Sequence, residues 1–178
     1  FSKEQENITD DKLGRNHVYF LPYLMGERSP HNDPMARATF TGITMDTSRS
    51  DMTQAVLEGV AFAIRDSFEV AKKLGMNITN ATLCGGGAKS PLWRKIIANV
   101  LNVDINIPQV EEGPSMGAAM LAMVAAGAYP SVKAAADAIC RVSETVKPDA
   151  QIAERYEEKY RNFTGIYPSL KSVFKLIN

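Results

Sequence analysis

The chain has 178 residues, of which 45% are hydrophobic, and this fits one globular domain with a sizeable core. Its 20 basic and 20 acidic side chains cancel, so charge gives no case for binding nucleic acid or an anionic membrane, both of which call for a basic surface. Two cysteines, Cys84 and Cys140, are too few for a disulfide framework and favour a reducing, cytoplasmic compartment. No apolar run reaches the roughly 18 residues of a membrane span, and no signal peptide is recognised. The first residue, Phe1, indicates a piece of a longer protein.

The first part of the chain predicts two short strands joined by a long ordered loop. Residues 1–16 are polar and are expected to form a loose segment ahead of the first strand. Residues 17–21 and 39–43 are β-prone, and Pro22 keeps the first run from extending as a central strand. Between them, residues 25–38 carry the glycine and prolines of a loop. That loop either lines a site or is simply solvated, and its candidate site residues are Glu27, Arg28 and His31.

A long helix follows this loop. Ser50 or Asp51 can cap its start, with Gln54 as the capping-box partner of Asp51. Gly75 can end the helix as the first residue past its C-terminus. Apolar residues recur along one face from Met52 to Ala71, which predicts a core-facing stripe. The charged residues off that stripe are expected to face solvent: Glu58, Arg65, Asp66 and Lys72.

The most informative stretch predicts a short buried strand, a glycine turn and the start of a helix. The strand ends at Cys84, whose thiol is expected in the core. Ser90 can cap the helix, with Pro91 at its first position, where a missing N–H costs nothing. Such a turn lets a ligand approach the backbone and meet unpaired N–H groups at the positive end of the helix dipole. Phosphate or a nucleotide is therefore the natural ligand of the three glycines between strand and helix, Gly85, Gly86 and Gly87.

The glycine turn leaves other interpretations open. The glycines can equally serve close packing of the strand against the helix. A Walker A loop would need glycine at Leu83 and Ala88, so that motif is absent. A dinucleotide fingerprint starting at Gly85 fails at Ser90, where a third glycine or an alanine belongs. Asp104 nevertheless stands about 20 residues past the turn, where a nicotinamide-binding domain carries an acid.

The second half of the chain predicts one strand and three helices. Residues 103–107 form the strand. Residues 116–126, with Ser115 as the cap, form a helix of small side chains, which suits sliding contact with a neighbour or plain alanine-rich helix propensity. A further helix covers about 132–140, and residues 150–174 form a helical tail. The tail carries aromatic and apolar residues at helical spacing that predict a core stripe: Ile152, Tyr156, Tyr160, Phe163, Tyr167 and Leu170.

Three segments together resemble the C-terminal half of the FGGY carbohydrate kinases. Residues 38–58 match that family's second signature. Residues 85–90 look like its adenosine-binding turn, and residues 113–119 resemble the hinge-helix motif shared by actin-like ATPases. Within the family, residues 21–34 are most similar to the members that phosphorylate xylulose. The resemblance covers essentially residues 17–175.

The resemblance implies an α/β domain of the actin-like ATPase, ribonuclease H-like kind, with a mixed sheet flanked by helices. Residues 1–178 would be the C-terminal nucleotide-binding lobe of a two-lobe sugar kinase. The N-terminal lobe, with the catalytic aspartate and the sugar pocket, would lie outside this chain. Pro91 stands where some relatives contact adenine with a polar side chain, so it offers only a packing surface. Carried over by position, the residues that hold the adenosine side of ATP or ADP are Gly85, Gly86, Gly87, Ala88 and Pro91.

The implied function is phosphorylation of D-xylulose to D-xylulose 5-phosphate with ATP and Mg²⁺. No catalytic residue and no metal ligand is expected in this chain, and the chain alone is expected to be inactive, because phosphoryl transfer needs both substrates positioned together. A kinase for another sugar, such as ribulose or gluconate, and a non-catalytic actin-like nucleotide-binding module remain alternatives. The expected partners are ATP, the sugar and the N-terminal lobe, with a homodimer also open and with no nucleic acid or membrane.

Overall fold

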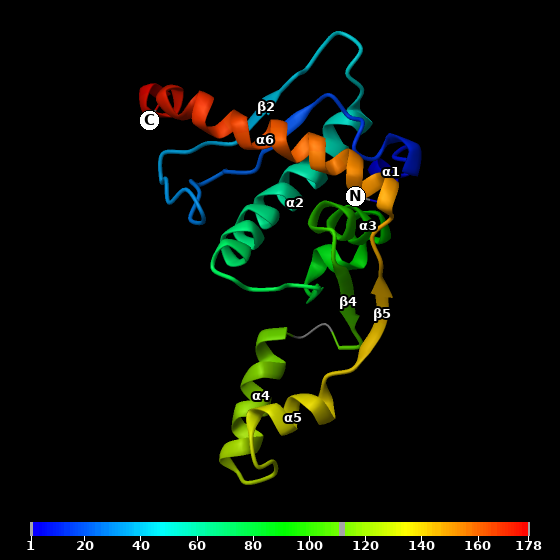
Figure 1. Ribbon diagram of the computed structural model, residues 1–178, viewed down its shortest axis with the longest axis vertical. Coiled ribbons are helices and arrows are strands. Elements are labelled where there is room, and N and C mark those ends of the chain that lie inside the picture. Colours follow the sequence, from blue (N-terminus) through cyan, green and yellow to red (C-terminus); the bar gives the residue numbers. More distant parts are fainter. Residues whose placement is uncertain (1, 111–112, 178) are drawn as a thin grey trace.

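The computed structural model describes residues 2–110 and 113–177 (Figure 1). In chain order its α-helices, 3₁₀ helices (η) and strands are α1 (Ser2–Gln5), η1 (Asp10–Lys12), β1 (Tyr19–Leu21), β2 (Thr39–Thr41), α2 (Arg49–Lys73), β3 (Asn80–Thr82), η2 (Gly86–Lys89), α3 (Pro91–Leu101), β4 (Asp104–Pro108), α4 (Gly113–Ala125), α5 (Val132–Ile139), β5 (Val142–Val146) and α6 (Ala150–Ile177). Among these helices, not one combines the length and the apolar character that crossing a membrane requires.

The strands form two small sheets. β3 pairs in parallel with β4, and β4 pairs antiparallel with β5, so this three-stranded sheet is mixed. β1 and β2 form a separate antiparallel pair in which Phe20 lies opposite Phe40. In Figure 1, helices α2, α3 and α6 lie near one end of β4 and β5, and helices α4 and α5 lie beyond the opposite end. The predicted mixed sheet flanked by helices is confirmed, but β5 was not among the expected strands.

Helix α2 begins earlier than the caps chosen from the sequence. Ser48 is its N-cap: the Ser48 hydroxyl accepts the Asp51 N–H at 3.2 Å, and an Asp51 carboxylate oxygen accepts the Ser48 N–H at 2.8 Å. The capping box is therefore Ser48 with Asp51, and the predicted pairing of Asp51 with Gln54 is wrong. At the other end, Gly75 has a φ of +87°, and its N–H returns to the last turn, as predicted for a residue just past the helix.

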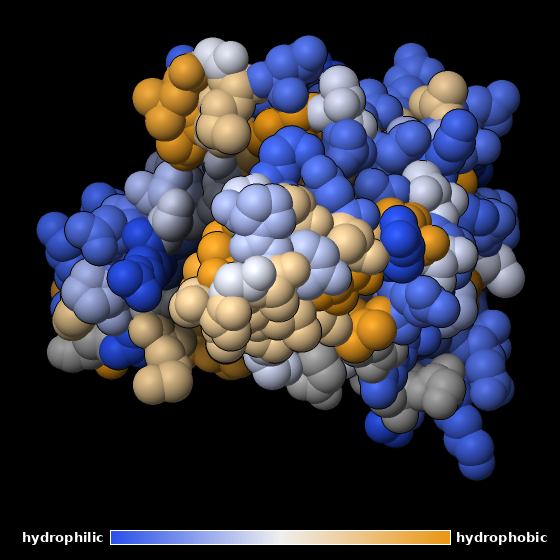
Figure 2. Space-filling model, turned by 90° about the horizontal axis from the view of Figure 1, so that it is seen from below, coloured by the Kyte–Doolittle hydropathy of each residue, from blue (hydrophilic) through white to orange (hydrophobic). Residues whose placement is uncertain are grey.

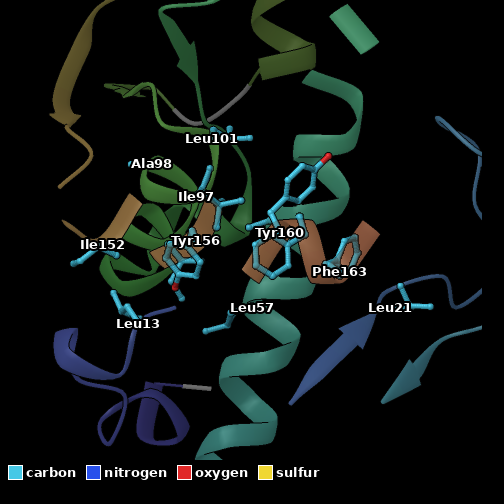
Figure 3. Packing of buried hydrophobic residues seen from close by; sticks show 14 of the residues in the cluster. Leu13, Leu21, Leu57, Ile97, Ala98, Leu101, Ile152, Tyr156, Tyr160 and Phe163 are labelled. Atoms are coloured by element: carbon cyan, nitrogen blue, oxygen red, sulfur yellow. The ribbon is translucent and has the colours of Figure 1, made fainter. Parts of the chain in front are cut away.

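The apolar core lies where α6 crosses α2 and α3. Figure 3 shows Tyr156, Tyr160 and Phe163 of α6 turned toward Leu57 of α2 and toward the apolar side chains of α3. The Phe62 ring of α2 lies 5.1 Å from the Phe163 ring, measured between centroids. The predicted stripe of α6 is confirmed, because its sixth member, Leu170, is half-buried against the same core and the other five are buried: Ile152, Tyr156, Tyr160, Phe163 and Tyr167.

The N-terminal segment before β1 is part of this core, so the expectation of a loose polar stretch is wrong. Ile8 and Leu13 are buried, and both belong to the main apolar cluster. Gly14 packs so closely on α6 that a Cβ built on it would lie 2.8 Å from the Cβ of Arg155. Two apolar side chains on either side of η1 are enough to fix an otherwise polar segment over the end of the core.

The solvent face predicted for α2 is wrong for three of its four charged residues. Glu58, Arg65 and Asp66 are buried, and only Lys72 is exposed. The predicted apolar stripe of α2 is mostly half-buried instead. Strand β1 packs against part of that stripe, because a Cβ built on Gly59 of α2 would lie 2.1 Å from the carbonyl oxygen of Phe20 in β1.

Glu58 is paired with the last helix and with the N-terminal segment. Its side chain is 1% exposed, and it forms an ion pair with Lys159 of α6, whose side chain is 3% exposed. One Glu58 oxygen also accepts the Tyr156 hydroxyl at 3.0 Å and the Gln54 amide at 2.7 Å. Burial lowers the pKa of Lys159, and the Glu58 carboxylate opposes that shift. A charged pair is tolerated at this depth because both partners are satisfied.

About two turns beyond Glu58 in α2, Arg65 and Asp66 attach this helix to α3 and α6. The Arg65 guanidinium donates to the Val100 carbonyl at 3.0 Å and to Glu157 at 2.8 Å. It also lies 4.2 Å above the centre of the Tyr160 ring. Asp66 accepts the Tyr160 hydroxyl at 2.6 Å. Burial raises the pKa of Asp66, and the hydrogen bond from Tyr160 partly offsets that rise.

Helices α4 and α5 form a hairpin that projects beyond the sheet (Figure 1). Helix α4 is rich in alanine and methionine, yet none of its described residues is buried, and Leu121 is 60% exposed. Seen from below, the nearest surface, over this hairpin, is broadly apolar (Figure 2). An apolar helix normally lies in a core, so this face has the character of a surface that something else covers.

We expect Glu58→Gln to lower the free energy of unfolding by about 3 to 5 kcal/mol, because it leaves the Lys159 cation buried without a counter-charge. The midpoint of urea denaturation measures the effect. Glu154→Gln, at an exposed position of α6, is the matched control and should change the value by no more than about 0.5 kcal/mol.

Glu58→Gln combined with Lys159→Met should recover part of the loss, because it removes both charges together. A Glu58→Gln variant as stable as the parent chain would show that this pair does not hold α2 to α6.

Candidate functional site

The predicted strand, glycine turn and helix are present in that order. After β3, the Leu83 N–H continues the pairing with β4 by donating to the Asn106 carbonyl at 2.9 Å. The chain then turns through Gly85 and η2 into α3. The Ser90 hydroxyl accepts the Trp93 N–H at 3.2 Å, and Pro91 occupies the first turn of the helix, so the predicted cap is confirmed.

The strand before the turn is more exposed than the sequence predicts. Cys84 is exposed, and β3 holds no buried residue, so the expectations of a buried strand and a core thiol are wrong. β3 pairs with another strand on one side only within the described residues, because it lies at the end of its sheet. A position at the edge leaves short side chains in contact with solvent even where the residues are β-prone.

The three glycines have different surroundings. Gly85 has a φ of +89° and a ψ of 178°, a conformation that side chains with a Cβ rarely adopt. A Cβ built on Gly85 or Gly86 would meet no atom within 4 Å, so the backbone there faces open space. A Cβ on Gly87 would lie 1.9 Å from the Trp93 ring. Close packing therefore explains Gly87, and Gly85 and Gly86 leave the backbone open to a ligand.

The other two candidate residues differ in accessibility. Ala88 is 2% exposed, so its side chain packs inward and only its backbone can line a ligand site. Pro91 is exposed beside the turn and offers an apolar ring surface with no N–H. Four of the five candidates, Ala88 apart, thus lie at least partly at the surface around one turn.

Sequence reasoning missed the side chains that fix the turn. The Arg94 guanidinium donates through Nε to the Ala88 carbonyl and through Nη1 to Glu144 of β5 at 2.7 Å. The Trp93 indole N–H donates to the Leu57 carbonyl of α2 at 3.1 Å. No local pattern could reveal these contacts, because Leu57 and Glu144 lie 36 and 50 residues away from their partners.

The N-terminal end of the chain reaches the same turn. The Ser90 hydroxyl, which caps α3, also donates to the Gln5 side-chain oxygen at 2.6 Å. The Gln5 amide nitrogen is buried and has no hydrogen-bond partner among the described residues. Gln5 therefore links α1 to the start of α3, directly after the glycine turn.

Two motifs singled out in the sequence meet at this place. A Cβ built on Gly113, the first residue of α4, would lie 3.3 Å from the Cys84 sulfur. The start of the segment 113–119 therefore adjoins the glycine turn of residues 85–90. The motifs are separated in the sequence, and the fold makes them neighbours.

The loop of residues 25–38 lies elsewhere, on the other side of α2 from the turn (Figures 1 and 3). His31 stacks on the Tyr167 ring at 4.0 Å between centroids, and Glu27 accepts the His31 N–H at 2.7 Å. The Tyr167 hydroxyl donates to Asp33 at 2.7 Å, and this hydrogen bond lowers the pKa of that carboxyl. Arg28 is exposed. His31 thus holds the loop against α6, and Glu27 supports the loop from within.

Residues 2–126 match the FGGY family of carbohydrate kinases, C-terminal domain. The xylulose kinase of Staphylococcus epidermidis is 36% identical over 162 residues, which make up 91% of this chain and 33% of that protein. This chain thus spans about a third of the length of the curated relatives it matches.

Solved structures of carbohydrate kinases also match this chain. A crystal structure from Brucella ovis, described as a xyloylose kinase, has a TM-score of 0.81 and 36% identity, with 97% of this chain and 38% of that chain covered. Gluconate kinase from Lactobacillus acidophilus has a TM-score of 0.84 and 27% identity, with 93% and 33% covered. The fold is that of an actin-like ATPase, as the resemblance implied. The chain belongs to the FGGY family of carbohydrate kinases and matches its C-terminal domain.

We expect Gly87→Ala to destabilise the fold by about 1 to 3 kcal/mol, because the new methyl group would overlap the Trp93 ring. Gly86→Ala is the matched variant, and it should leave stability within about 0.5 kcal/mol because its methyl group meets open space. Thermal unfolding of both variants measures the contrast. Equal effects would contradict the assignment of packing to one glycine and openness to the other.

Proposed function

We propose that residues 1–178 are the C-terminal nucleotide-binding lobe of an ATP-dependent sugar kinase, and that the sugar is D-xylulose. The observation that carries the proposal is the open backbone at Gly85 and Gly86, which precedes the capped start of α3. Backbone N–H groups at a helix start favour a phosphate-bearing ligand. The family of carbohydrate kinases supports phosphoryl transfer, and the relatives named xylulose kinase support the substrate.

In this proposal each candidate residue contributes differently to nucleotide binding. Gly85 and Gly86 lie against the ribose and the α-phosphate of ATP or ADP, because no side chain blocks the approach. Gly87 and Ala88 shape the turn from within through their packing. Pro91 supports the adenine by apolar contact and adds no hydrogen bond, so selectivity for the base must come from other groups.

The reaction joins a sugar hydroxyl oxygen to the γ-phosphorus of ATP and breaks the bond from that phosphorus to the bridging oxygen of ADP. A carboxylate from the proposed N-terminal lobe takes the hydroxyl proton. Within residues 2–110 and 113–177, no group of three or more His, Cys, Asp or Glu side chains could hold a metal ion. Mg²⁺ would therefore be bound through the nucleotide phosphates and by residues of the other lobe.

The other lobe would also cover the apolar hairpin of α4 and α5. Leu121 and Met123 of α4 are exposed. The surface over the hairpin is broadly apolar (Figure 2), and about two thirds of the relatives' length has no counterpart here. We therefore place the N-terminal lobe against this hairpin, beside the glycine turn. Both described cysteines are free, in keeping with the cytoplasmic location that we propose.

A different sugar is the main rival within this class. The likeness to gluconate kinase is as high by TM-score as that to the other kinases described above, so the fold does not discriminate between sugars. The residues of the proposed sugar pocket belong mainly to the other lobe. Substrate choice must therefore be tested on the complete protein.

The decisive measurement is ADP release by the complete parent protein with ATP and Mg²⁺ against D-xylulose, ribulose, gluconate and glycerol. We expect the highest kcat/KM with D-xylulose. Residues 1–178 alone should release no ADP above a heat-denatured control, because one lobe cannot position both substrates.

Preference for another sugar would retain the kinase and overturn D-xylulose. The absence of turnover with every sugar, together with retained ADP binding, would favour a non-catalytic nucleotide-binding module.

Arg94→Gln should raise the KM for ATP about tenfold in the complete enzyme and leave the KM for the sugar unchanged, because it releases the Ala88 carbonyl and loosens the turn. Glu144→Gln should act in the same direction but less, since it removes only the outer partner of Arg94. Arg141→Gln, at an exposed position before β5, is the control. Steady-state kinetics with each substrate varied in turn gives both constants, and equal rises in the two KM values would argue against a local effect on the turn.

A further inference from the structure

A polar cavity of about 190 Å³ lies between the segment before β1 and one face of α6. Arg155, Lys159 and Asn162 line it from α6, at the spacing that places side chains on one side of a helix. Arg15 and Tyr19 line it from the opposite side. The cavity shares no lining residue with the glycine turn, so it is a separate feature.

The lining carries more positive than negative charge. It includes the three cations Arg15, Arg155 and Lys159 and a single carboxylate, that of Glu158. Lys159 is already neutralised by its ion pair with the buried Glu58. No described ion pair joins Glu158 to either arginine. Arg15 interacts electrostatically with Asp11, which lies outside this lining, so within the cavity itself Glu158 is the one carboxylate near the two guanidinium groups.

Both arginines have donors available. The Arg15 side chain is exposed and makes no hydrogen bond or ion pair with any residue in the described ranges. The Arg155 guanidinium uses one nitrogen, Nη1, for two long hydrogen bonds of 3.4 Å, to the carbonyls of Asp11 and Leu13. Its other N–H groups remain for a ligand. Tyr19 accepts the Asn162 amide at 3.3 Å, which leaves its own O–H to donate.

We propose that this cavity binds a small oxyanion, namely phosphate or the phosphoryl group of a small molecule. Two planar guanidinium groups from different elements supply the charge and the N–H donors that such a group needs, and a tyrosine hydroxyl adds one more donor. The volume of about 190 Å³ is below the roughly 300 Å³ at which pockets for drug-sized ligands begin, which favours a small anion over a nucleotide. An anion bound here contacts both the segment before β1 and α6. Its binding does not involve the glycine turn.

The test is equilibrium dialysis of the complete parent protein with radiolabelled inorganic phosphate at low ionic strength. We expect one phosphate bound in this cavity per chain, with affinity that falls as sodium chloride is added. Arg15→Gln should weaken that binding about tenfold, which is the cost of losing one charge-assisted contact. The side chain of Arg15 is exposed and interacts with Asp11 only through charge at the surface, so this variant should fold normally.

Two further variants make the outcome specific. Glu158→Gln should tighten binding several-fold, because it removes the one carboxylate from the lining, and an unfolded protein cannot mimic a gain. Arg161→Gln, exposed on the same helix outside the cavity, should change nothing. Phosphate binding that responds to neither Arg15→Gln nor Glu158→Gln would overturn the proposal, as would the absence of binding at millimolar phosphate. Neither result depends on the kinase activity, so failure here leaves the proposed function untouched.

Discussion

The buried carboxylate of Glu58 is the interaction on which the rest of the structure depends. It sits in the middle of α2, and most of its compensation comes from outside this helix: the Lys159 cation and the Tyr156 hydroxyl of α6, and the backbone N–H of Gly14 at 3.4 Å. A buried charge is tolerated only when it is paired and hydrogen-bonded. Sliding α6 along α2 by one residue would break these contacts together, so the carboxylate sets how the two helices align.

The alignment of α2 in turn positions the glycine turn. The carbonyl of Leu57, next to Glu58, accepts the Trp93 indole near the start of α3, and Arg65 donates to the Val100 carbonyl near its end. Helix α3 is therefore attached to α2 at two points about two turns apart. Because the turn leads directly into α3, its orientation follows from these two hydrogen bonds and from the Arg94 contact with Ala88.

Local signals in the sequence predicted most helix ends, although not the start of α2, and they predicted no distant pairing. The Ser90–Pro91 helix start and the Gly75 helix end depend only on neighbouring residues, and both are confirmed. Glu58 and Arg65 were expected in solvent because charges on a helix usually are solvated, and their partners on α6 lie 92 to 101 residues further on. Strand β5 escaped notice for a related reason: it is almost wholly exposed, so no apolar alternation marks it.

At the candidate site, the sequence located the turn but could not separate packing from openness, because both need glycine. The surroundings separate them: Gly87 lies against Trp93, while Gly85 and Gly86 face open space. A turn fixed from within and bare on its outer side is already shaped before a ligand arrives, which lowers the entropy cost of binding. Cys84, the residue directly before the turn, adjoins Gly113, where the exposed apolar helix α4 begins. A second lobe that buries α4 would therefore lie next to the turn as well. Its closure would cover both the apolar face of α4 and the open backbone of the turn.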